Sequence, residues 1–165
     1  MAITKQKKSE ILEGLNKIFK EAKTVVFVNF HKLSVADATT LRSDLRKSGV
    51  NYLVAKKTLT KKAIADSKVG GEVPEMEGEL ALAYLAKGDD ITSPARSIHD
   101  FGKTHKDMLS IMGGVFEGKL VNREVMTEIA LIPSMQTLRA QFVNVINSPI
   151  QGLAMVLDQI AKSKV

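Results

Sequence analysis

The chain has 165 residues, of which 44% are hydrophobic and 25% are charged, and it contains no cysteine. This composition supplies enough apolar residues for a packed core and argues against wholesale disorder. The lack of cysteine excludes disulfides, thiolate metal sites and cysteine nucleophiles, and it is compatible with a reducing compartment.

Positive charge is concentrated in the first third of the chain. Residues 1–68 carry fifteen Lys and Arg against six Asp and Glu, whereas residues 69–133 carry six against eleven. Residues 134–165 hold three basic residues and one acidic residue. A basic lobe, an acidic middle and an apolar tail predict a bridging protein, with a polyanion bound at the front and a protein at the back.

Short helices and strands alternate before the tail. Strands are predicted where β-branched and aromatic residues run together, and helices where apolar residues recur every three or four positions. Capping residues, Gly and Pro mark the ends of these elements. In chain order we expect a helix at 4–22, a strand at 24–30, a helix from Ser34 to Gly49, a strand at 51–55, a helix at 58–67, a strand at 79–86, a helix capped by Ser93, a strand at 108–116, and a short helix from Asn122 to before Pro133.

Four strands with helices between them predict an α+β fold. Over residues 1–132 we expect a globular RNA-binding domain, built as a compact α/β sandwich of the ferredoxin-like kind. Gly113 and Gly114 interrupt its last strand, which indicates a β-bulge. Residues 133–165 are predicted to form a separate domain, a long helix kinked near Pro149.

The tail carries one apolar stripe and almost no charge. Arg139 is the only charged residue between Ser134 and Leu157. A free helix with such a face would aggregate, so either the rest of the chain or another protein must cover it. Polar residues and Pro149 interrupt the stripe, so we expect no membrane span, and no signal peptide is expected at the basic start. The stripe consists of Met135, Leu138, Phe142, Val145, Ile146, Ile150, Leu153, Val156, Leu157 and Ile160.

Catalytic and metal-binding signals are weak. His31, His99 and His105 do not have metal-ligand spacing. Asp89 and Asp90 precede a helix, where a solvated turn is expected. Nothing in the sequence gathers a nucleophile, a base and an oxyanion donor, so we expect neither an enzyme nor a cofactor.

The basic residues of the first third form a pattern suited to a nucleic-acid backbone. Arg42 and Arg46 are four apart and share a helix face, and Thr58 at a helix start can offer its hydroxyl to a phosphate. Phe30 and His31 end a strand, where they can stack on an unpaired base. Phosphate contacts of this kind give a salt-dependent affinity. The candidate RNA contacts are Lys5, Lys7, Lys8, Phe30, His31, Arg42, Arg46, Lys56, Lys57, Thr58 and Lys61.

Several short segments stand in a characteristic order and spacing. They are Leu41-Arg-Ser-Asp-Leu-Arg-Lys-Ser-Gly49, Val54-Ala-Lys-Lys-Thr-Leu59, Gly113-Gly-Val-Phe-Glu-Gly118, Ile132-Pro-Ser134, Ser148-Pro-Ile150 and Leu153-Ala-Met-Val-Leu157. Together they resemble the bacterial ribosomal stalk-base family, large-subunit protein ten, over essentially the whole chain.

The resemblance implies a structural component of the large ribosomal subunit. It implies that the 1–132 domain docks on large-subunit rRNA beside another ribosomal protein, and that the helix of 133–165 carries dimers of the small acidic stalk protein, which recruits translation GTPases. We expect one dimer on each side of Pro149, on segments 135–147 and 150–162, and therefore two in all. The expected location is the ribosome, in the cytoplasm.

Two other functions stay open at this point. A non-ribosomal RNA chaperone would share the basic lobe and use the tail for self-association. A small enzyme would need a deep pocket lined by groups with shifted pKa values. The behaviour of the tail distinguishes the RNA chaperone from the ribosomal scaffold. A self-assembling tail gives homo-oligomers, whereas a scaffold gives a soluble complex only with its partner.

Overall fold

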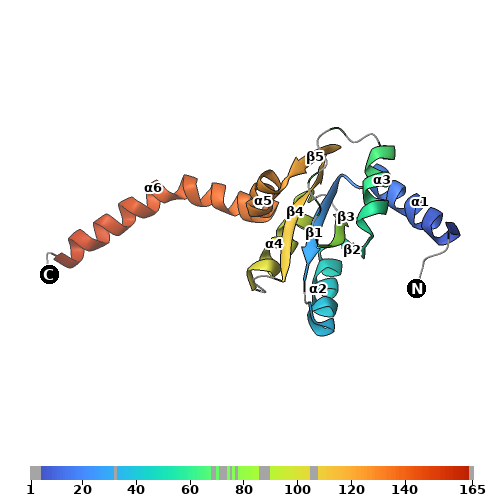
Figure 1. Cartoon of the computed structure of the whole chain (residues 1–165). Coiled ribbons are helices and arrows are strands. Elements are labelled where there is room, and N and C mark those ends of the chain that lie inside the picture. The colour runs from blue at the N-terminus through green and yellow to red at the C-terminus, as the bar shows by residue number, and fades with distance from the viewer. Residues whose placement is uncertain are drawn as a thin grey trace. The chain divides into compact units, whose positions relative to one another are not determined.

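A computed structural model describes residues 5–31, 33–67, 70, 74, 76, 78–85, 90–104 and 108–163, with side chains from residue 6 onward. The chain divides into two units, Met1–Ile132 and Pro133–Val165. Within the described residues the elements of the first unit are α1 (Lys5–Glu21), β1 (Thr24–Phe30), α2 (Val35–Lys47), β2 (Val50–Val54), α3 (Lys57–Ser67), β3 (Glu79–Leu85), α4 (Ser93–Thr104), β4 (Leu109–Phe116), β5 (Lys119–Asn122) and α5 (Arg123–Leu131) (Figure 1).

The strands form one antiparallel sheet in the order β2-β3-β1-β4-β5. Without β5 and the inserted α3, the succession β1-α2-β2-β3-α4-β4 on this sheet is the ferredoxin-like arrangement, as predicted. The pairing of β1 with β4 shifts register between Phe27 and Val28, where Met112 is the extra residue. The predicted bulge is therefore confirmed, one residue before Gly113.

The sequence did not predict β5, so the expected number of strands was wrong. This strand forms a hairpin with the end of β4 across Glu117 and Gly118, which have φ values of 49° and 79°. Two positive φ angles in a two-residue loop are typical of a type I′ hairpin turn. β5 has only four residues and is polar at both ends, which leaves little periodicity for a sequence pattern to detect.

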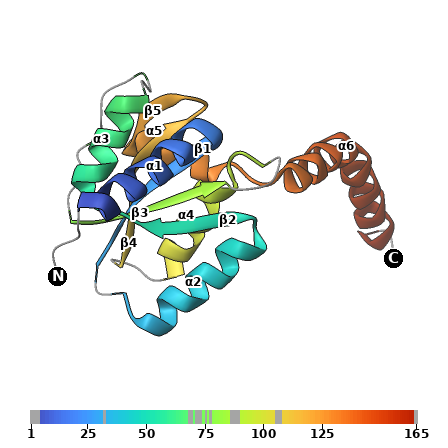
Figure 2. The ribbon, with the colours of Figure 1, turned by 90° about the vertical axis from the view of Figure 1, so that its right-hand side faces the viewer.

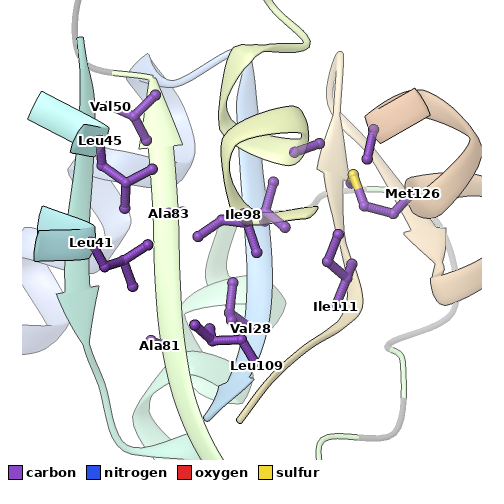
Figure 3. Close-up of a cluster of buried hydrophobic side chains, with 13 residues drawn as sticks. Val28, Leu41, Leu45, Val50, Ala81, Ala83, Ile98, Leu109, Ile111 and Met126 are labelled. Atoms are coloured by element: carbon purple, nitrogen blue, oxygen red, sulfur yellow. The ribbon is translucent and has the colours of Figure 1, made fainter. Parts of the chain in front are cut away.

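Helices cover both faces of the sheet, and the central strand β1 is buried between them. Val26 and Val28 belong to a cluster with α2, α4 and α5, which Figure 3 shows in part, whereas Val25 and Phe27 belong to a cluster with α1 and α3. Figure 2 shows α1 and α3 on one side of the sheet and α2 on the other. Burial on both faces explains why residues 25–28 are continuously apolar rather than alternating.

The second unit is a single helix, α6 (Met135–Ser163), with no buried residue. Ser134 caps it, since the backbone N–H of Thr137 donates to Ser134 Oγ at 3.3 Å. Pro149 lies inside the helix, which continues through it. Proline has no N–H to donate to the carbonyl four residues back, and Figure 2 shows that the helix changes direction along its length. None of the described helices is long and apolar enough to cross a membrane.

Candidate nucleic-acid and protein interfaces

Four of the predicted RNA contacts meet around one cavity of about 670 Å³, which is called the α3 cavity below. Phe30 at the end of β1 lies on one side, and Lys56, Lys57 and Thr58 at the start of α3 lie on another. The ends of β1 and β2 and the starts of α3 and β3 converge here. The other lining residues are Ile11, Val54, Ala55, Leu59, Gly78, Glu79 and Leu80.

Within the part of the chain that the structure describes, no side chain caps the start of α3. The first backbone bonds of the helix run from the N–H groups of Leu59 and Thr60 to Lys56 O, both at 3.0 Å, so the N–H groups of Lys57 and Thr58 have no acceptor within the helix. Lys56 stands in the cap position, and its ammonium group accepts no hydrogen bond. By contrast, the side chain of Ser34 caps α2. Positive side chains at a positive helix end favour a bound anion.

Arg42 and Arg46 lie together on the exposed face of α2, as their spacing predicts. They line a shallow hollow with neighbouring polar residues of the same helix. Lys47 also lines it, but its ammonium group is paired with Asp44 at 2.9 Å. Because α2 and α3 lie on opposite sides of the sheet, this pair of arginines forms a group separate from the α3 cavity (Figure 2).

The other predicted RNA contacts are spread over the first unit. Lys7 and Lys8 are exposed on α1, and Lys61 is exposed on α3. His31 is exposed after β1, and its backbone N–H donates to Met108 O at 2.9 Å. The side chain of Lys5 lies outside the described residues.

Each of the ten predicted contacts on α6 is exposed. Their exposed fractions range from 37% at Leu138 to 70% at Val145. The two core clusters of the first unit are built from residues of that unit. A helix whose apolar stripe stays open to solvent offers a surface for another protein.

Asp90 begins a turn, and its side chain is also part of a hydrogen-bond network. Arg96 donates from Nη1 to Asp90 Oδ2 at 3.0 Å and from Nε to Ile132 O at 2.9 Å, which ties the start of α4 to the end of α5. Burial alone raises the pKa of Asp90, but hydrogen bonds from Arg96 and Thr92 outweigh it and hold the pKa below its usual value. Asp89 lies outside the described residues. Among the residues that the structure describes, no cluster of His, Asp and Glu is suited to a metal ion.

The apolar walls of the α3 cavity are not evident from the sequence. In the sequence, Ile11 belongs to the apolar stripe of a helix that is expected to face the core, and Val54 lies near the end of a predicted strand. Leu59 lies beside the predicted phosphate contacts, but its sequence position does not show what it faces. The walls come from several elements, so only the lysines at the β2–α3 junction signalled a site.

Comparison with known proteins decides the family. The family model described as Ribosomal protein L10 matches residues 3–103. The large ribosomal subunit protein uL10 of Lactobacillus johnsonii is 33% identical over 158 residues, which are 96% of this chain and 95% of that protein. The chain belongs to the ribosomal protein L10 family. The protein of the same name from Delftia acidovorans is 34% identical over 164 residues, 99% of this chain and 91% of that protein.

Membership of the ribosomal protein L10 family confirms the resemblance drawn from the short segments. The chain is a structural protein of the large ribosomal subunit and not an enzyme, and its place is the ribosome in the cytoplasm. The family model ends within α4, whereas the relatives align across nearly the whole chain, α6 included.

Proposed function

We propose that the chain is a scaffold at the base of the ribosomal stalk. The first unit, residues 1–132, binds large-subunit rRNA beside a neighbouring ribosomal protein, and the second, residues 133–165, carries dimers of the acidic stalk protein. In this way the chain supports the recruitment of translation GTPases. The observation that carries the proposal is the exposure of α6, a helix of 29 residues with no buried side chain.

The stripe on α6 has the spacing of a helix that enters an apolar groove on a partner. Anchors at positions i, i+3, i+4 and i+7 are the pattern by which such grooves recognise helices. Met135, Leu138 and Phe142 follow this pattern before Pro149, and Leu153, Val156 and Ile160 repeat it afterwards. We therefore propose one dimer on 135–147 and one on 150–162, with Pro149 separating the two sites.

The RNA-binding part of the proposal rests on charge and on the helix start at α3. Basic side chains are exposed on α1, α2 and α3, and the start of α3 adds backbone N–H groups that have no acceptor within the helix. Neutralising phosphates with such groups releases counterions, so the affinity should fall steeply as salt is raised.

Native mass spectrometry of the full chain titrated with stalk protein tests the proposal. We expect a saturated complex of one chain with two dimers, and we expect residues 1–132 alone to bind rRNA without any dimer. A third dimer on the full chain would contradict the proposed stoichiometry, and no dimer at all would contradict the role of α6. Homo-oligomers of the chain alone would instead favour an RNA chaperone with a self-associating tail.

A further inference from the structure

We infer that the α3 cavity takes a single unpaired nucleotide of the rRNA, with its base against the apolar walls and its phosphate at the start of α3. The inference rests on the proposed RNA-binding function and makes it more specific. In addition to general contact with the RNA backbone, one extruded base binds at one defined place on the first unit.

The cavity has a size and a lining suited to a base. Its volume of about 670 Å³ lies within the range of roughly 300–1,000 Å³ that small-ligand clefts have. Ile11, Val54, Leu59 and Phe30 are among the residues that line it. Contact with phosphates alone needs cations and no apolar wall, so these side chains call for an occupant with an apolar face. Every nucleobase has one.

The α3 side of the cavity carries groups that are suited to bind a phosphate. Lys56 and Lys57 line the cavity, and the N–H groups of Lys57 and Thr58 at the start of α3 have no acceptor within the helix. Glu79 lies at the start of β3, also on the lining. Its carboxylate repels an anion, so the phosphate is expected on the α3 side of the cavity. A nucleotide carries the apolar face of a base next to an anionic phosphate. The cavity likewise places an apolar wall next to positively charged groups.

Phe30 is held in place before any RNA arrives. Its side chain is half-buried and packs against the core cluster formed with α2 and α4, and the residue is also part of the cavity lining. An aromatic ring that is already ordered loses little conformational entropy when a base stacks on it. An aromatic residue that is already ordered therefore stands at the edge of the cavity, beside the start of α3.

The test fills the cavity without disturbing the core. Val54→Trp adds bulk at a lining position that is 49% exposed, and Leu53→Trp is the matched control, because Leu53 is 39% exposed on the same strand and does not line the cavity. Phe30→Leu removes the ring and keeps an apolar side chain. Binding of each full-length variant to large-subunit rRNA is measured at several salt concentrations, and the base edges of the bound rRNA are probed chemically.

We expect Val54→Trp and Phe30→Leu each to weaken binding about tenfold, which is within the range for losing one stacked base. The salt dependence should stay unchanged because the phosphate contacts remain, and Leu53→Trp should bind like the wild type. One nucleotide should be protected at its base edge by the wild type and exposed with the cavity variants. If Val54→Trp does not fold, Phe30→Leu with the base probing decides.

Wild-type affinity in Phe30→Leu, with no base protected by the wild type, would overturn the inference and leave rRNA binding intact. Failure of the wild type to bind rRNA at any salt concentration would instead overturn the proposed function itself. The two failures are therefore distinguishable.

Discussion

Arg42 on α2 holds its guanidinium carbon 5.9 Å from the ring centroid of Tyr52 on the edge strand β2. The stacked ring orients a predicted RNA contact on the outside of the sheet. The hydroxyl of Tyr52 is buried and has no hydrogen-bond partner among the described residues. Burial raises the pKa of Tyr52 to about 12, and the positive charge of Arg42 lowers it in part.

The first prediction concerns Tyr52→Phe. The folded state keeps the tyrosine proton up to about pH 12, whereas the unfolded chain loses it near the ordinary pKa of 10.0. The contribution of Tyr52 to stability is therefore complete below pH 10 and is lost as the pH rises toward 12. Tyr52→Phe should lose less stability than the wild type over this interval.

At neutral pH, Tyr52→Phe removes a buried hydroxyl that has no partner among the described residues, so the free energy of unfolding should stay the same or rise by up to about 1 kcal/mol. Urea unfolding at neutral and alkaline pH checks both expectations. A decrease of more than about 1 kcal/mol at neutral pH would show that the hydroxyl is bonded in solution.

The second prediction compares Arg46→Ala with Lys47→Ala. The two residues are neighbours on exposed α2, but Lys47 is paired with Asp44. Arg46→Ala should weaken rRNA binding and lower the slope of log affinity against log salt by about one, which is the effect of losing one phosphate contact. Lys47→Ala should change the slope less. Equal slopes for Arg46→Ala and the wild type in filter binding would remove Arg46 from the RNA surface.

The third prediction places a charge on the stripe of α6. Phe142→Asp should release a stalk dimer, because a carboxylate would be buried unpaired in the partner's apolar groove. Gln141→Asp is the control, since it adds the same charge beside the stripe and should keep both dimers. Native mass spectrometry counts the dimers.

The same variants test whether the first unit folds independently of α6. Phe142 is 67% exposed, so the melting temperature of the first unit should not change. A loss of folding of the whole chain in Phe142→Asp would mean that the stripe packs on its own molecule.

The fourth prediction compares two glycines. A methyl group on Gly114 of β4 would overlap the carbonyl oxygen of Val25 and the side chain of Met126, so Gly114→Ala should reduce the free energy of unfolding by about 1–3 kcal/mol. Gly14 lies in α1 with nothing within 4 Å of the added carbon. Gly14→Ala should raise stability by about 0.5–1 kcal/mol through helix propensity. Urea unfolding of both variants measures whether the free energy of unfolding falls or rises. An unchanged free energy of unfolding in Gly114→Ala would show that β1 and β4 can move apart.

Local pattern was enough to predict most of the elements. The continuous apolar run of β1, the cap at Ser34 and the stripe of α6 are features of neighbouring residues, and such features decide secondary structure directly. β5 was not predicted because a segment of four residues after a tight turn is too short to show a periodic hydrophobic pattern. Only its pairing with β4 makes it a strand.

The candidate site, like the fold, could be predicted from the sequence only in part. The spacing of Arg42 and Arg46 predicted one face of α2, because helix geometry sets the relation of residues four apart. No spacing predicted that Ile11, Val54 and Leu59 share a cavity with Phe30, because they come from four different elements.

By itself, then, the sequence determined the helices, most strands, the position of the charge and the apolar character of the tail, since these depend on residues close together in the chain. Only the tertiary structure decided which of the basic residues meet an apolar cavity and that Asp90 is bound by Arg96. Both depend on the packing of elements distant in sequence, which brings side chains together irrespective of their spacing along the chain.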